Sequence, residues 1–110
     1  MEEAEHSMNI AMELIAGAGD SRSYCMEAID SAKEGRFEEA RGCIKNAVDA
    51  MIQTHEIQTD LIRNEMTGSA LPVSLLMVHA QDHLNLALIM RDIAEELIVV
   101  YERLNKLEGE

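Results

Sequence analysis

The sequence is poor in aromatic residues and in basic charge. It has no Trp, two Tyr and one Phe, so a core has to be built from aliphatic side chains, supplemented by eight methionines. Nine Lys and Arg stand against 21 Asp and Glu, which gives a net charge of −12 at pH 7. A surface of this charge repels phosphate backbones and anionic lipid heads, which argues against nucleic-acid binding through a basic surface.

Cysteine and long apolar runs are also scarce. Cys25 and Cys43 are too few for a disulfide framework, and we expect both to be small buried residues. Apolar runs such as Leu75–Val78 are far shorter than the roughly twenty residues of a membrane span, and the acidic start Met1–Glu5 is unlike a secretory signal. We therefore expect residues 1–110 to form a single, soluble, cytoplasmic domain.

Hydrophobic residues recur with helical spacing along the whole chain, and glycines and the single proline divide it into three segments. We predict helices over about 3–34, 37–66 and 74–107. Gly35 fits the left-handed position after a helix, and so short a turn makes the first two helices antiparallel. The sequence thus predicts an all-α fold, an antiparallel three-helix bundle.

The first two predicted helices have recognisable packing faces. Small residues predict a closely packed side of the first helix: Ala11, Ala18, Ser21, Cys25, Ala28 and Ala32. The stripe predicted for the second helix is Ile44, Val48, Met51, His55, Gln58 and Ile62. Gly17 and Gly19 weaken the first helix, so we expect a kink or a close helix approach there, with Asp20 capping a second segment. No lysine follows these glycines as in a phosphate-binding loop, so no nucleotide cofactor is expected.

The third segment has more apolar surface than one bundle can bury. One seam follows the spacing of a coiled coil: Leu75, His79, Asp82, Leu86, Ile89, Ile93, Leu97, Val100 and Leu104. Other apolar residues, such as Leu84 and Ile98, lie off this seam, from which we infer a homo-oligomer formed through the helix. In a symmetric assembly the copies of Asp82 would meet at the axis, where their repulsion favours protonation or a hard cation such as Mg²⁺.

The polar cluster His79-Ala80-Gln81-Asp82-His83 interrupts this apolar helix, and its spacing leaves three interpretations open. The first is a set of satisfied polar residues that fixes the register of an oligomer. The second is a transition-metal site that takes a third ligand from elsewhere, such as His55, which we otherwise expect to be a hydrogen-bonded core residue. The third is a nucleophilic histidine, because imidazole is largely neutral at pH 7 and His79 lies near a helix N-terminus, which favours a bound anion.

A longer stretch of sequence carries a family resemblance. Residues 73–84, Val-Ser-Leu-Leu-Met-Val-His-Ala-Gln-Asp-His-Leu, closely resemble the signature of the lactose/cellobiose-type IIA proteins of the phosphoenolpyruvate-dependent sugar phosphotransferase system. Residues 16–23 resemble the first helix of that family, and residues 37–40 and 54–62 resemble its second helix. One departure is Asn85, where members usually carry Met; it adjoins the site and concerns the partner surface.

The resemblance implies a homotrimer with the third helices around a threefold axis, and a shared Mg²⁺ bound there by Asp82. It implies that the phosphocarrier HPr phosphorylates Nε2 of His79, which passes the phosphoryl group to a Cys of the IIB component. The IIB component then phosphorylates a β-linked disaccharide as it enters through the membrane IIC component. Gln81 and His83 are candidates for orienting the imidazole or contacting phosphate. The resemblance favours this transferase function over a metal-binding or purely structural helical oligomer.

Overall fold

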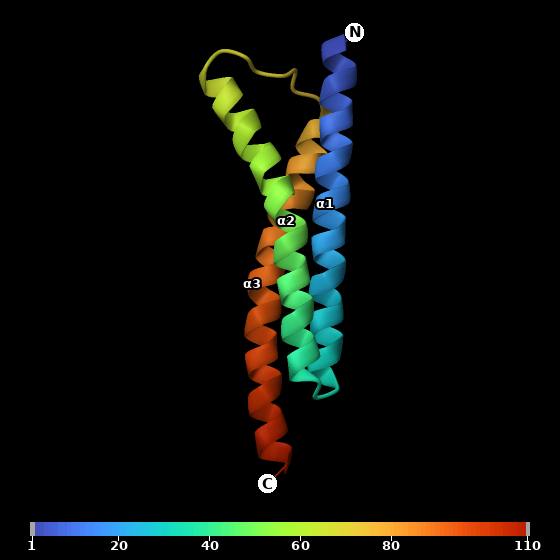
Figure 1. The fold of residues 1–110 in the computed structure, drawn as a ribbon, viewed down its shortest axis with the longest axis vertical. Helices are drawn as coiled ribbons and strands as arrows, with labels where there is room; N and C mark the ends of the chain where they lie inside the picture. Colours follow the sequence, from blue (N-terminus) through green and yellow to red (C-terminus); the bar gives the residue numbers. More distant parts are fainter. Residues whose placement is uncertain (1, 110) are drawn as a thin grey trace.

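Three long helices build the protein in the computed structural model, which describes residues 2–109. α1 spans Glu2–Lys33, α2 spans Phe37–Met66 and α3 spans Leu75–Gly109, so each predicted helix end lies within two residues of the observed one. Figure 1 shows α2 running opposite to α1 and α3. The predicted antiparallel three-helix bundle is therefore confirmed. The bundle measures 63 × 21 × 20 Å, because each helix runs along most of the long axis of the bundle.

The turn between α1 and α2 takes the predicted glycine geometry. Gly35 has a φ of +79°, in the left-handed region where a side chain would be strained. The amide of Gly35 donates to the carbonyl of Ala32 at 3.1 Å, and that of Arg36 donates to the carbonyl of Ser31 at 2.9 Å. These two bonds satisfy carbonyls that the end of α1 leaves free, and they reverse the chain within three residues.

The central packing element is α1, against which both α2 and α3 lie. All six small residues predicted for its packing side are buried: Ala11, Ala18, Ser21, Cys25, Ala28 and Ala32. The hydroxyl of Ser21 donates to the carbonyl of Ala47 on α2 at 2.8 Å in the buried interface. Small side chains therefore let α1 and α2 approach until a side chain on one helix reaches the backbone of the other.

The predicted break near Gly17 and Gly19 takes the form of a close helix approach. The alternative, a kink with Asp20 capping a new segment, is wrong, because α1 is one uninterrupted helix. A Cβ atom placed on Gly17 would lie 1.8 Å from Oγ1 of Thr54 on α2, whereas one placed on Gly19 would meet nothing within 4 Å. Gly17 is therefore the position at which the buried Thr54 requires the absence of a side chain.

This contrast predicts opposite effects of one substitution at two neighbouring glycines. Gly17→Ala is expected to destabilise the fold by about 1–3 kcal/mol, because the added methyl group overlaps Thr54. Gly19→Ala is expected to stabilise it by roughly 0.5–1 kcal/mol through better helix propensity alone. Chemical denaturation measures both, and Thr54→Ala in the Gly17→Ala background should recover part of the loss. Equal effects of the two substitutions on stability would show that Thr54 does not limit how closely α1 and α2 pack.

The buried side of α2 agrees with only part of the predicted stripe. Ile44 and Met51 are buried as expected, but the helix turns Ala47 and Thr54 inward and leaves His55 exposed. The expectation of a core histidine at position 55 is therefore wrong. The close approach of α1 explains which side chains are buried. At the two pairs of adjacent residues on α2, Ala47 is buried rather than Val48, and Thr54 rather than His55, because the smaller side chain fits against α1.

Two apolar stripes run along α3 on different sides. The stripe packed into the bundle is Met77, Ala80, Leu84, Ala87, Ala94 and Ile98. The predicted coiled-coil seam faces away from α1 and α2, and most of its apolar members are 44–87% exposed: Leu75, Leu86, Ile89, Ile93, Val100 and Leu104. One bundle therefore leaves the apolar side chains of this seam exposed, as the sequence indicated. Within residues 2–109 no helix combines the length and hydropathy needed to cross a bilayer.

Candidate functional site

The polar cluster of α3 begins in the first turns of a capped helix. Ser74 precedes the helix, and its hydroxyl accepts a hydrogen bond from the amide of Met77 at 3.1 Å, which is the contact of an N-cap residue. The carbonyl of Ser74 accepts from the amide of Val78 at 3.0 Å. The cap fixes the direction in which the helix starts, and with it the side of the bundle on which His79 emerges.

His79 and His83 form a pair on the surface of α3. The side chain of His79 is exposed and that of His83 is half-buried. Their Nε2 atoms are 3.0 Å apart, and the rings meet edge to face with centroids 4.4 Å apart. A hydrogen bond between two imidazole nitrogens requires a proton on one and a free lone pair on the other. In one of the two tautomeric arrangements that allow this bond, Nε2 of His79 holds the lone pair.

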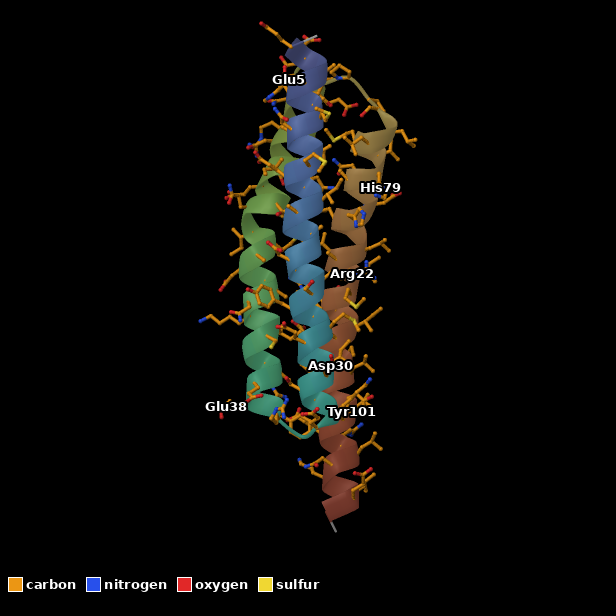
Figure 2. All side chains as sticks on the ribbon, turned by 90° about the vertical axis from the view of Figure 1, so that its right-hand side faces the viewer. Glu5, Arg22, Asp30, Glu38, His79 and Tyr101 are labelled. Atoms are coloured by element: carbon orange, nitrogen blue, oxygen red, sulfur yellow. The ribbon has the colours of Figure 1, made fainter. Side chains whose placement is uncertain are left out.

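Two different surfaces meet at this pair. On the N-terminal side of His79 along α3 lies an open, almost wholly apolar hollow of about 400 Å³, lined by Leu75, Leu76 and the imidazole itself. Below it, an open groove between α1 and α3 is lined by His83 and, from α1, by Ile15, Gly19, Arg22, Ser23, Met26 and Glu27. Figure 2 shows the side of the molecule where α1 and α3 run along each other, with His79 and Arg22 labelled. The histidine pair thus lies between an apolar surface and a groove that also contains charged side chains, Arg22 and Glu27.

The structure brings together two of the four predicted site residues and separates the others. Gln81 lies on another side of α3, where its Oε1 accepts a hydrogen bond from Nε2 of Gln58 on α2 at 2.8 Å. Asp82 is exposed on the outward seam of α3. In this chain, therefore, Gln81 ties α3 to α2 instead of contacting His79, and Asn85 is an exposed residue one turn beyond Asp82.

The second interpretation, a transition-metal site, lacks a third ligand. Across residues 2–109 no group of three or more His, Cys, Asp or Glu side chains is arranged to hold a metal ion. The exposed His55 does not join His79 and His83 in such a group. Zinc sites in proteins commonly use three or four protein ligands, so this pair by itself does not make one.

The cysteines add no reactive centre. Cys25 is fully buried, as expected, and burial raises the pKa of its thiol above the ordinary value. Cys43 is only half-buried, so the expectation of a buried residue is wrong there. Burial, followed by the charges of Glu27 and Glu39, also raises the pKa of the Cys43 thiol. Because the thiolate is the nucleophilic form of cysteine, neither side chain is activated at neutral pH.

Comparisons with known proteins point to one family. Residues 9–102 match the model of the family described as "PTS system, Lactose/Cellobiose specific IIA subunit". The chain is 42% identical over 105 residues to the lichenan-specific phosphotransferase enzyme IIA component of Bacillus subtilis, which covers 96% of each chain. It is 36% identical over 102 residues to the N,N'-diacetylchitobiose-specific EIIA component of Escherichia coli K12, covering 93% of this chain and 88% of that protein.

Solved structures give the same result. The crystal structure of the cellobiose-specific enzyme IIA from Bacillus anthracis matches with a TM-score of 0.88 at 37% identity, over 91% of this chain and 92% of that one. The IIA subunit in solution structures of the IIA(chitobiose)–HPr complex from Escherichia coli matches with a TM-score of 0.78 at 33% identity, over 90% and 96% of the two chains. In both sequence and fold, the chain therefore matches these relatives over nearly its whole length.

Proposed function

The chain belongs to the lactose/cellobiose-specific IIA family of the sugar phosphotransferase system, and from this membership we propose that it relays a phosphoryl group in the cytoplasm. Nε2 of His79 accepts the group from phosphorylated HPr and donates it to a Cys of the IIB component, which serves the uptake of a β-linked disaccharide through IIC. The observation that carries the proposal is the exposed imidazole of His79, with its Nε2 held 3.0 Å from that of His83. That a relative was solved in complex with HPr supports this donor.

We propose that the reactive arrangement of the histidine pair is the one in which His83 is the hydrogen-bond donor. When Nε2–H of His83 donates to Nε2 of His79, the proton of the His79 ring is on Nδ1 and the lone pair is on Nε2. This lone pair attacks phosphorus in line with the bond to the donor nitrogen. A new N–P bond forms on His79, the donor N–P bond breaks, and its electron pair stays on the donor. As phosphorus binds, the freed N–H of His83 becomes a donor to a phosphoryl oxygen.

The apolar hollow formed by Leu75 and Leu76 suits the docking of both partner proteins. It lies directly beside His79 and exposes almost no polar surface. A partner that covers it removes water from around the imidazole, and exclusion of water strengthens the electrostatic interactions of the phosphoryl group and protects it from hydrolysis. Positioning and charge stabilisation are most of what a protein contributes to phosphoryl transfer.

The outward seam of α3 is proposed to form a homotrimer around a threefold axis. The seam carries exposed apolar residues along the whole helix, with Asp82 among them. One carboxylate per subunit at the axis gives a set of oxygen ligands of the kind that hard cations prefer, so the donor chemistry fits the Mg²⁺ that the family implies. A bound ion would supply neutralisation of three like charges, and no step of the transfer requires it.

Replacing Asp82 by Leu tests the proposed position of this carboxylate. Asp82→Leu should retain the trimer and stabilise it, by about 1–4 kcal/mol, because the repulsion of buried carboxylates is removed. Thermal unfolding should show that EDTA lowers the melting temperature of the wild-type protein but not that of the variant. Asp49→Leu, an exposed aspartate on α2, removes the same charge away from the seam and should leave the EDTA effect intact. Dissociation of the Asp82→Leu protein in sedimentation experiments would place Asp82 elsewhere.

The proposed function is tested by reconstitution. The protein is incubated with phosphoenolpyruvate, enzyme I and HPr, and its intact mass is measured before and after addition of a IIB component. We expect a gain of one phosphate that requires HPr and disappears when IIB is added. A mass that never changes, with a standard IIA protein active in the same mixture, would reject the relay and support a structural oligomer.

A further inference from the structure

We propose that Arg22 of α1 binds the phosphoryl group carried by His79 and is a catalytic residue of the transfer. The inference rests on the proposed function and deepens it by naming a cation for the transferred anion. Arg22 lies on a different helix from the histidine pair, yet it lines the same groove as His83. Figure 2 shows Arg22 and His79 on one side of the molecule, along the line where α1 and α3 meet.

The direction of the phosphoryl group follows from the contact between the two histidines. The lone pair of a ring nitrogen lies in the ring plane, and a hydrogen-bond donor and a bonded phosphorus occupy the same direction from it. In the unphosphorylated protein Nε2 of His83 lies 3.0 Å from Nε2 of His79. A phosphoryl group on Nε2 of His79 takes the place of this contact, so the His83 ring turns aside and stays next to the phosphoryl oxygens. Because His83 lines the groove between α1 and α3, the phosphoryl oxygens come to lie at its edge.

Arg22 is free to meet this anion. Its side chain is exposed, and it forms no ion pair with any residue from 2 to 109, whereas Arg36, Arg41, Arg63 and Arg91 all pair with carboxylates. Glu27, the one carboxylate that lines the groove, is not bonded to it. Arg103 also has no ion pair in the described residues, but Arg22 is the one that lines the same groove as His83. The planar guanidinium presents paired N–H donors that match two phosphoryl oxygens.

The geometry also assigns an order to the contacts. The P–N bond to the donor breaks as the bond to Nε2 of His79 forms, and negative charge spreads over the three equatorial oxygens of phosphorus in the transition state. The guanidinium of Arg22 and the N–H of His83 approach those oxygens from the side of the groove. Arg22 therefore stabilises both the transition state and the phosphorylated product.

The test compares Arg22→Gln with Arg103→Gln. Arg103 is exposed near the end of α3, far along the helix from His79, and its loss changes the net charge equally. From the strength of hydrogen bonds to charged groups we expect Arg22→Gln to lower kcat/KM for phosphorylation by phospho-HPr about tenfold to a hundredfold. The equilibrium between phospho-HPr and the phosphorylated protein should shift toward phospho-HPr by about tenfold or more. Arg22→Lys should recover part of both effects, and Arg103→Gln should change neither by more than about twofold.

Two further measurements separate phosphate binding from a structural role. The ³¹P resonance of the phosphorylated protein should move in Arg22→Gln and not in Arg103→Gln, while the melting temperatures of both variants stay within about 2 °C of the wild type. Equal kinetics, equilibria and ³¹P resonances in the two variants would overturn the role of Arg22 and leave the relay standing. A wild-type protein that accepts no phosphate would overturn the relay and this inference together.

Discussion

Ile89→Asp is expected to convert the trimer into monomers at micromolar concentrations. Ile89 lies on the outward seam of α3, two turns beyond Asp82, and its side chain is 55% exposed in a single chain. The substitution loses three isoleucine contacts at the axis and adds a second layer of carboxylates. Each lost side chain contributes about 1.5–3 kcal/mol, so the trimer should weaken by roughly 5 kcal/mol or more. Sedimentation velocity measures the change directly.

The matched control for this prediction is on α2. Ile52 is 56% exposed, almost the same as Ile89, but it lies on α2 and not on the seam. Ile52→Asp introduces the same charge at a surface isoleucine and should leave the oligomeric state unchanged. If Ile52→Asp dissociates the assembly and Ile89→Asp does not, the copies of the chain meet through α2, and the proposed axis is wrong.

His79→Gln is expected to abolish phosphate incorporation while leaving the three-helix fold intact. The exposed imidazole makes no contact that the bundle needs, and glutamine has no nitrogen lone pair that can attack phosphorus. Intact mass after incubation with phosphoenolpyruvate, enzyme I and HPr gives the result. His55→Gln, at an exposed histidine on α2, should incorporate phosphate like the wild type.

His83→Gln should give a result different from those of His79→Gln and His55→Gln. Because His83 holds the tautomer and faces the phosphoryl group but does not carry it, we expect incorporation that is complete but slower by about tenfold or more. Full incorporation into His79→Gln, or none into His83→Gln, would reverse the roles assigned to the two rings.

Local chemistry made much of the fold predictable from the sequence. Gly35 marks the turn because few other residues accept its backbone geometry, and Ser74 marks the start of α3 because its hydroxyl satisfies a free amide. The small residues of α1 predict its buried side because only they permit close packing. Each of these signals is contained in a few neighbouring residues, and the structure confirms each of them.

Choices between neighbouring faces of a helix were not predictable in the same way. On α2, Thr54 and His55 are adjacent, and only the position of Gly17 on the opposite helix turns Thr54 inward. On α3 both stripes are apolar, so the sequence indicates two interfaces without telling which one packs on α1. These decisions depend on the approach of a second helix, which single-chain periodicity does not contain.

The same distinction applies to the candidate site, where contacts within one helix were predictable and contacts between helices were not. His79 and His83 lie side by side because they are one helical turn apart, a contact that the sequence spacing alone makes visible. Gln81 was a candidate for contacting phosphate, but its side chain is bonded to Gln58 on another helix. Arg22 was not identified at all, because its proximity to His83 arises only when α1 and α3 pack together.

The most direct test of the account is to locate the phosphorus atom in the phosphorylated wild-type protein. ¹⁵N-labelled histidine and ³¹P–¹⁵N coupling identify both the residue and the ring nitrogen that carries it. The account predicts a single phosphohistidine, at Nε2 of His79, because that nitrogen lies next to His83, which lines the groove shared with Arg22. Phosphorus on Nδ1 of His79, or on any other histidine, would contradict it.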